Sequence, residues 1–227
     1  MVKNIIDDGF NSEFVETAFF DGVLEMPILN PPTKIIIPNK VIPFSKRTRS
    51  ENYSEFPVFY EYDIEFSDIL RNPNYYYDEL ARFPGMITLD NSLYVDSPLT
   101  VQIANTYRNR AIGYYYQHKG IYVIPNVRWG DERSYTTNFL PEKFAFLGLP
   151  KHSILSIGTY GCSQTKEEKF QLRNGLEAML DELIPEVVLV YGSMSKYVFD
   201  GLRSKTNFVN FPDWTSIKKR GGTNGNK

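Results

Sequence analysis

Short apolar stretches alternate with longer amphipathic ones along most of this chain. The amphipathic stretches 98–118 and 165–183 carry apolar side chains at helical spacing and predict two helices. Thr165 with Glu168 forms a capping-box pattern at the start of the second of these helices. The apolar stretches, each short enough to be a strand, are "VIPFS", "GMITLD", "IYVIP", "SILSIG" and "VVLVYG". Strands that are apolar throughout and alternate with helices predict an α/β fold with a mainly parallel sheet.

About seven strands are predicted when the weaker patterns "PVFYEYD" (57–63) and "FVNF" (208–211) are included. Seven strands from β/α units favour a TIM-like barrel, complete or incomplete, with an open doubly wound sheet as the alternative. Residues 1–38 have no sustained period and contain four prolines, so we expect an N-terminal arm or cap there. Residues 39–212 are then a single α/β domain, and 213–227, rich in glycine and basic residues, a flexible tail.

The composition narrows the possible chemistry. The 227 residues are 42% hydrophobic and 23% charged with a net charge of −2, as in an ordinary globular protein without an overall attraction to nucleic acid. One cysteine and two histidines argue against a zinc site, whereas a magnesium ion held by oxygen ligands stays open. We find no apolar run of membrane-spanning length and no signal-peptide pattern, which favours a cytoplasmic protein with no membrane partner.

Polar or glycine-rich segments follow four successive predicted strands. They are "DNS" (90–92), "NVRWGDE" (126–132), "GTYGCSQT" (158–165) and "GSMSK" (192–196). In both architectures, ligands bind at the C-terminal ends of parallel strands. We therefore expect these segments to form one polar pocket.

Arg128 is the leading residue of this expected pocket, because its planar guanidinium suits an anion. The alternative is that it pairs with Asp131 or Glu132 and only holds the loop. We expect its carboxylate partner to be Asp90 or Asp131. The candidates for acid/base catalysis or magnesium ligation are Asp90, Asp131 and Glu132.

The other candidates would contact a ligand directly. Two of the segments, 158–165 and 192–196, are glycine-containing turns. Their free backbone N–H groups can hold a phosphate, unless the glycines only permit tight turns. The candidates in these turns are Gly158, Thr159, Gly161, Gly192 and Ser193. Outside them, the candidates are Ser92, Arg108, Asn126 and Trp129. We expect Trp129 to form a wall or lid and Gly130 to permit a sharp turn.

Several ordered motifs point to a known family. They are "LDNSLYVDSP" (89–98), "NTYRNRAIG" (105–113), "VIPNVRWGDE" (123–132), "SIGTYGC" (156–162) and "VYGS" (190–193). Over roughly residues 20–212 the chain resembles the domain of unknown function 4417 family, whose members occur in bacteria, their phages and other mobile elements. The resemblance implies one shared domain in a phage or mobile-element setting, inside a bacterial host cell, and implies no reaction. Val95 stands where many relatives carry a basic residue, which weakens an anion contact at that position.

Three functional hypotheses follow, and whether the protein is an enzyme is left open. The leading one is a pocket that binds, and hydrolyses or transfers, a phosphate-bearing small molecule or nucleotide. The second is a nucleic-acid-binding protein of mobile-element replication or regulation, based on the basic residues in 46–49 and 218–220 and on the many tyrosines. The third is a binder of a host protein through a Tyr/Phe-rich surface.

Overall fold

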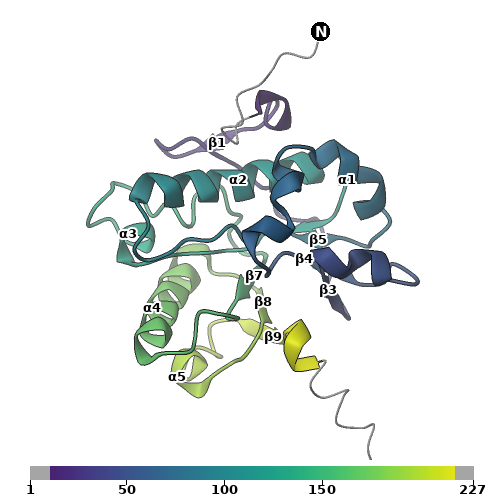
Figure 1. The fold of residues 1–227 in the computed structure, drawn as a ribbon. Helices are drawn as coiled ribbons and strands as arrows, with labels where there is room; N and C mark the ends of the chain where they lie inside the picture. Colours follow the sequence, from purple (N-terminus) through teal and green to yellow (C-terminus); the bar gives the residue numbers. More distant parts are fainter. Residues whose placement is uncertain (1–10, 218–227) are drawn as a thin grey trace, which may run out of the picture.

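The computed structural model describes residues 11–217, in which short strands alternate with helices (Figure 1). The strands are β1 (Phe20–Asp21), β2 (Met26–Pro27), β3 (Val41–Pro43), β4 (Phe56–Val58), β5 (Met86–Ile87), β6 (Val123–Ile124), β7 (Ile154–Gly158), β8 (Val187–Tyr191) and β9 (Asn207–Phe211). The α-helices are α1 (Pro73–Leu80), α2 (Leu99–His118), α3 (Glu132–Tyr135), α4 (Lys166–Leu183) and α5 (Lys196–Phe199). The 3-10 turns are η1 (Ser12–Phe14), η2 (Phe44–Arg49), η3 (Asp63–Glu65) and η4 (Ser67–Leu70).

The strands pair in separate short ladders. Strands β3 and β4 pair in parallel, as do β5 and β6, and β7, β8 and β9 form a parallel three-stranded sheet. Strands β1 and β2 form a small antiparallel hairpin. The expected sheet of about seven strands is therefore wrong, and so are the TIM-like barrel and the open doubly wound sheet. The α/β character holds, but the described residues contain no closed barrel, and only the single bridges Phe59–Leu89 and Asn126–Ser156 connect neighbouring ladders.

Polar side chains end the β5–β6 ladder. The backbone N–H of Asn126 donates to Thr88 Oγ1 at 2.7 Å instead of to a carbonyl of the neighbouring strand. The carbonyl of Leu89 accepts from the side-chain amides of Asn109 and Asn126. Because these groups satisfy backbone atoms that a longer ladder would otherwise pair, strand pairing stops after two residues.

Both long helices expected from the sequence are present. Helix α4 begins at the expected capping box: Thr165 Oγ1 accepts from the Glu168 N–H at 3.1 Å, and Glu168 Oε2 accepts from the Thr165 N–H at 3.0 Å. Helix α2 departs from a simple apolar face because it also buries polar side chains. Arg110, 1% exposed, donates to the carbonyls of Ala145 and Leu147 at 2.8 and 2.9 Å, and burial lowers its pKa to about 9.

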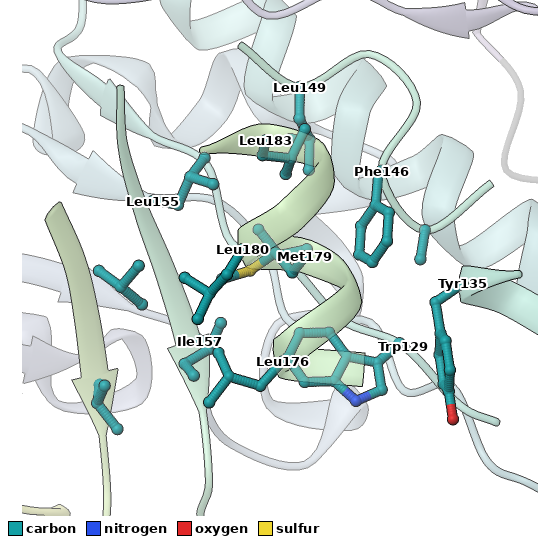
Figure 2. Packing of buried hydrophobic residues seen from close by; sticks show 14 of the residues in the cluster. Trp129, Tyr135, Phe146, Leu149, Leu155, Ile157, Leu176, Met179, Leu180 and Leu183 are labelled. Atoms are coloured by element: carbon teal, nitrogen blue, oxygen red, sulfur yellow. The ribbon is translucent and has the colours of Figure 1, made fainter. Parts of the chain in front are cut away.

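The largest apolar cluster lies between α4 and β7 (Figure 2). Leu176 and Leu180 of α4 face Ile157 of β7, and the indole of Trp129 lies beside the middle of the helix, next to Leu176. The helix approaches that ring through Gly175, where an added Cβ would lie 2.1 Å from Trp129 Nε1. The absence of a side chain at this one position allows the contact.

The described part of the N-terminal arm, residues 11–38, packs over α2. Asp21 of β1 accepts from the Gly148 N–H at 2.8 Å, and Thr17 shares a hydrogen bond of 2.8 Å with the hydroxyl of Tyr114 on α2. The division at residue 39 stays a prediction. Most of the expected flexible tail, 218–227, lies outside the described residues. In the described part of the chain, no helix has the length and apolarity needed to cross a membrane.

Candidate functional site

The polar segments after β5, β6 and β7 meet around one cavity of about 380 Å³. Its wall is made of side chains from these three segments and from the first turns of α4. The lining residues are Ser92, Leu93, Tyr94, Val95, Val127, Arg128, Trp129, Gly130, Gly158, Gly161, Cys162, Thr165, Glu167, Glu168, Gln171 and Leu172. Among the residues proposed from the sequence, the structure thus brings together Ser92, Arg128, Trp129, Gly158 and Gly161.

Arg128 forms a two-pronged ion pair with Asp90 behind the cavity wall. Its Nε donates to Asp90 Oδ1 at 2.9 Å, and its Nη2 donates to Asp90 Oδ2. The remaining nitrogen, Nη1, donates to the sulfur of Cys162 at 2.8 Å. Of the two expected carboxylate partners, the structure pairs Arg128 with Asp90 and not with Asp131.

Burial and charge act against each other in this pair. Burial raises the pKa of Asp90, and the charge and hydrogen bonds of Arg128 together with the Asn126 amide oppose that rise. Burial acts to lower the pKa of Arg128, but Asp90 and Cys162 outweigh it and the pKa is raised. The guanidinium stays charged and is largely neutralised by its partner, so a ligand meets little net positive charge there.

A buried polar network supports Asp90 from beneath. Asn126 Nδ2 donates to Asp90 Oδ1 at 2.8 Å, and the hydroxyl of Tyr60 donates to Asn126 Oδ1 at 3.0 Å. Tyr60 also shares a hydrogen bond of 2.6 Å with Ser156 Oγ and stacks on Tyr191. Asn126, expected to contact a ligand, therefore orients the carboxylate that pairs with Arg128.

Tyr60 was missed by sequence reasoning, because one tyrosine in an alternating strand carries no sign that its hydroxyl points into a network. Gly158 makes room for its ring: a Cβ at Gly158 would lie 2.5 Å from Tyr60 Cδ1. This glycine thus permits a close approach of a side chain.

Replacing Tyr60 by Phe is expected to lower the free energy of unfolding by about 1–3 kcal/mol, because Asn126 and Ser156 each lose a buried partner. Urea denaturation measures the change. Tyr62→Phe is the matched control, since that side chain is 82% exposed and its hydroxyl lies in water. Equal stabilities for the two variants would show that the network does not contribute to stability.

The two glycine-containing turns, which follow β7 and β8, are joined by hydrogen bonds. The N–H of Thr159 donates to the Tyr191 carbonyl and that of Gly192 to the Phe211 carbonyl, at 2.9 and 2.8 Å. Thr159 Oγ1 donates to the Ser193 carbonyl at 2.8 Å. The N–H groups of Thr159 and Gly192 are therefore already used within the fold. Thr159, Gly192 and Ser193 do not line the cavity, whereas Gly158 and Gly161 do.

Asp131 and Glu132 lie away from Asp90. Asp131 is the N-cap of α3 and pairs with Arg133 at 2.8 Å. Both acids line a second cavity of about 350 Å³, beside the first one. The three carboxylates proposed for catalysis thus do not converge.

Arg108 and Gly130 were also considered from the sequence, as a ligand contact and as the site of a sharp turn. Arg108 lies on α2, where it donates to Asn105 Oδ1 at 2.8 Å. Gly130 provides space for a neighbouring side chain, because a Cβ there would lie 2.4 Å from Gln102 Oε1. Among residues 11–217, no three His, Cys, Asp or Glu side chains form a group that could hold a metal ion.

The fold and the site define an α/β protein with a cavity of about 380 Å³ beside an arginine that is neutralised by a buried carboxylate. Residues 18–212 match the model of a family described as "Domain of unknown function (DUF4417)", and the chain belongs to this family. This confirms the resemblance noted from its motifs.

Two phage proteins are similar to the chain over 136 residues, or 60% of its length. The Gene 1 protein of Mycobacterium phage L5 is 29% identical and is covered over 56% of its own length. The Gene 1 protein of Mycobacterium phage D29 is 28% identical and is covered over 48%. The chain therefore matches about half the length of these relatives. No solved structure matches it.

Proposed function

We propose that this protein binds a small phosphate-bearing molecule, such as a nucleotide, in the cavity between the β5, β6 and β7 segments and α4. The observation that carries the proposal is the position of Arg128, whose Nη1 faces Cys162 on the cavity wall while Nε and Nη2 hold Asp90. Sulfur is a weak hydrogen-bond acceptor, so a ligand oxygen would be a better partner for Nη1.

The rest of the cavity suits the flat, apolar part of such a ligand. Leu93, Val127, Trp129 and Leu172 line it and are all buried by the surrounding protein. Ligand pockets of this size are mostly apolar with a few polar groups that orient the ligand. A nucleobase against these side chains would leave its sugar or phosphate oxygen near Arg128.

The proposed role of the cavity is to bind this ligand and not to convert it. Hydrolysis or transfer would need a carboxylate free to act on the ligand, and Asp90 is engaged by Arg128 and Asn126. Asp131 and Glu132 line the second cavity. The geometry thus favours binding over turnover.

A thermal-shift screen with nucleosides and nucleotides, with and without magnesium, tests the proposal. A ligand present at one hundred times its dissociation constant adds about 2.7 kcal/mol to the free energy of unfolding. Val95→Trp is expected to abolish the shift by filling the cavity mouth. Val101→Trp is the matched control, because Val101 is similarly exposed on α2 but does not line the cavity. No shift across the panel, or an equal loss in both variants, would contradict the proposal.

The nucleic-acid alternative has less support from the structure. Arg47 of the basic segment 46–49 pairs with Glu79 at 2.8 Å and lies over the Phe44 ring. The basic residues 218–220 lie outside the described residues. Binding to a host protein stays a prediction, for which exposed Tyr62, Tyr94 and Tyr160 are available.

A further inference from the structure

Building on the proposed function, we infer that the cavity accepts a ligand with at most one phosphate, and that Glu167 selects against longer polyphosphates. The charges on the cavity wall determine which of these ligands fits.

Acidic side chains outnumber basic ones on this wall. Among the described residues that line the cavity, Arg128 is the one cation and Glu167 and Glu168 are the acids. Arg128 is already neutralised by Asp90. A triphosphate would bring several negative charges to a wall whose own net charge is negative, whereas a nucleoside or monophosphate needs only one acceptor near Arg128.

The N-terminus of α4 does not reverse this balance. A helix N-terminus acts as roughly half a positive charge. Here the N–H groups of Gln164 and Thr165 donate to Glu168 Oε2, and that of Glu168 donates to Thr165 Oγ1. Two full carboxylate charges in the first turn therefore outweigh the helix end, and part of its donor capacity is already taken.

Glu167 is the acid that can be changed without removing the cap. Its Oε1 accepts from Gln171 Nε2 at 2.9 Å, and Gln171 Oε1 accepts from the hydroxyl of Tyr135 at 3.2 Å. This chain of contacts holds the carboxylate at the cavity wall. Glu168, in contrast, completes the capping box and its replacement would disturb the helix.

The experiment compares adenosine, AMP, ADP and ATP, and the guanosine series, by calorimetric titration at low salt without magnesium. Low salt is chosen because ions screen exposed charges beyond about 10 Å at 0.1 M. For the natural protein we expect affinity to fall from mono- to triphosphate. Glu167→Gln should raise ATP affinity relative to AMP about fivefold, the effect of one unit charge at about 4 Å in water.

Glu186→Gln is the matched control, because Glu186 is exposed just before β8, at the opposite end of that strand from the glycine turn. It removes the same charge and is expected to leave the ATP to AMP ratio unchanged. If ATP binds the natural protein as tightly as AMP, the charge selection is wrong while the proposed function stands. If both variants change the ratio equally, Glu167 has no special role. If no member of either series binds, both the proposed function and this inference fail.

Discussion

Replacing Asp90 by Ala is expected to lower the free energy of unfolding by about 3–5 kcal/mol, because it leaves the Arg128 guanidinium partly buried without its counter-ion. Asn126 also loses the carboxylate oxygen to which it donates. Denaturant unfolding at neutral pH measures the loss. The double variant Asp90→Leu with Arg128→Met removes both charges. Its loss in free energy of unfolding should be clearly smaller than the sum of the losses from Asp90→Leu and Arg128→Met made singly. Additive losses would show that the two side chains do not stabilise each other.

The same pair predicts a pH dependence in Arg128→Ala. Burial raises the pKa of Asp90, and this variant lacks the guanidinium that opposes the rise. The folded state then keeps a proton that the unfolded state loses near pH 3.9, about the ordinary value for Asp. Stability therefore falls as pH rises above that value, and the variant should be more stable at about pH 5 than at about pH 8, relative to the natural protein. A flat difference between the two pH values would contradict a buried Asp90.

Replacing Gly175 by Leu is expected to lower the free energy of unfolding by about 3 kcal/mol, the upper part of the range for overpacking. The cause is steric: even a Cβ at this position would lie 2.1 Å from Trp129 Nε1. The gain of about 1 kcal/mol from replacing a helical glycine offsets only part of a larger clash. Thermal or urea unfolding of the variant measures the net loss.

Asn174→Leu is the control for Gly175→Leu, because its side chain borders an open cavity and not the indole. A second control adds Trp129→Leu to Gly175→Leu. The smaller side chain at 129 should recover part of the loss, since the two positions are in contact. If Gly175→Leu is as stable as the natural protein, the helix does not lie against Trp129 as described.

Local sequence patterns predicted the positions of the long helices and of the strands. Thr165 and Glu168 are three residues apart, and each side chain accepts a hydrogen bond from the backbone N–H of the other. The start of α4 can therefore be predicted from a short stretch of sequence. The breaks between ladders could not be seen in this way. They depend on contacts such as Asn109 to Leu89 and Asn126 to Thr88, which are 20 and 38 residues apart. Apolar runs show where a strand can form but not how far it pairs.

The candidate site could likewise be predicted only in part from the sequence. Placing Arg128 at the end of a strand restricted its expected carboxylate partner to Asp90 or Asp131, and the structure selects Asp90. The glycine turns and the acids at 131 and 132 were not separable from structural turn residues by type alone. Thr159 and Gly192 use their N–H groups within the fold, and Asp131 caps a short helix. Only the three-dimensional positions distinguish these roles from ligand binding.

The hairpin of the N-terminal arm has a consequence for synthesis on the ribosome. The Val23 N–H donates to Glu142 and Asp21 accepts from the Gly148 N–H, across 119 and 127 residues of chain. At a translation rate of about 5–20 residues per second, roughly 6–25 s pass between the synthesis of Asp21 and that of Gly148. During that time the hairpin has been made but Glu142 and Gly148 have not. The hairpin can therefore form these two contacts only after residues 142–148 have been synthesised, although it is among the first parts of the described chain to leave the ribosome.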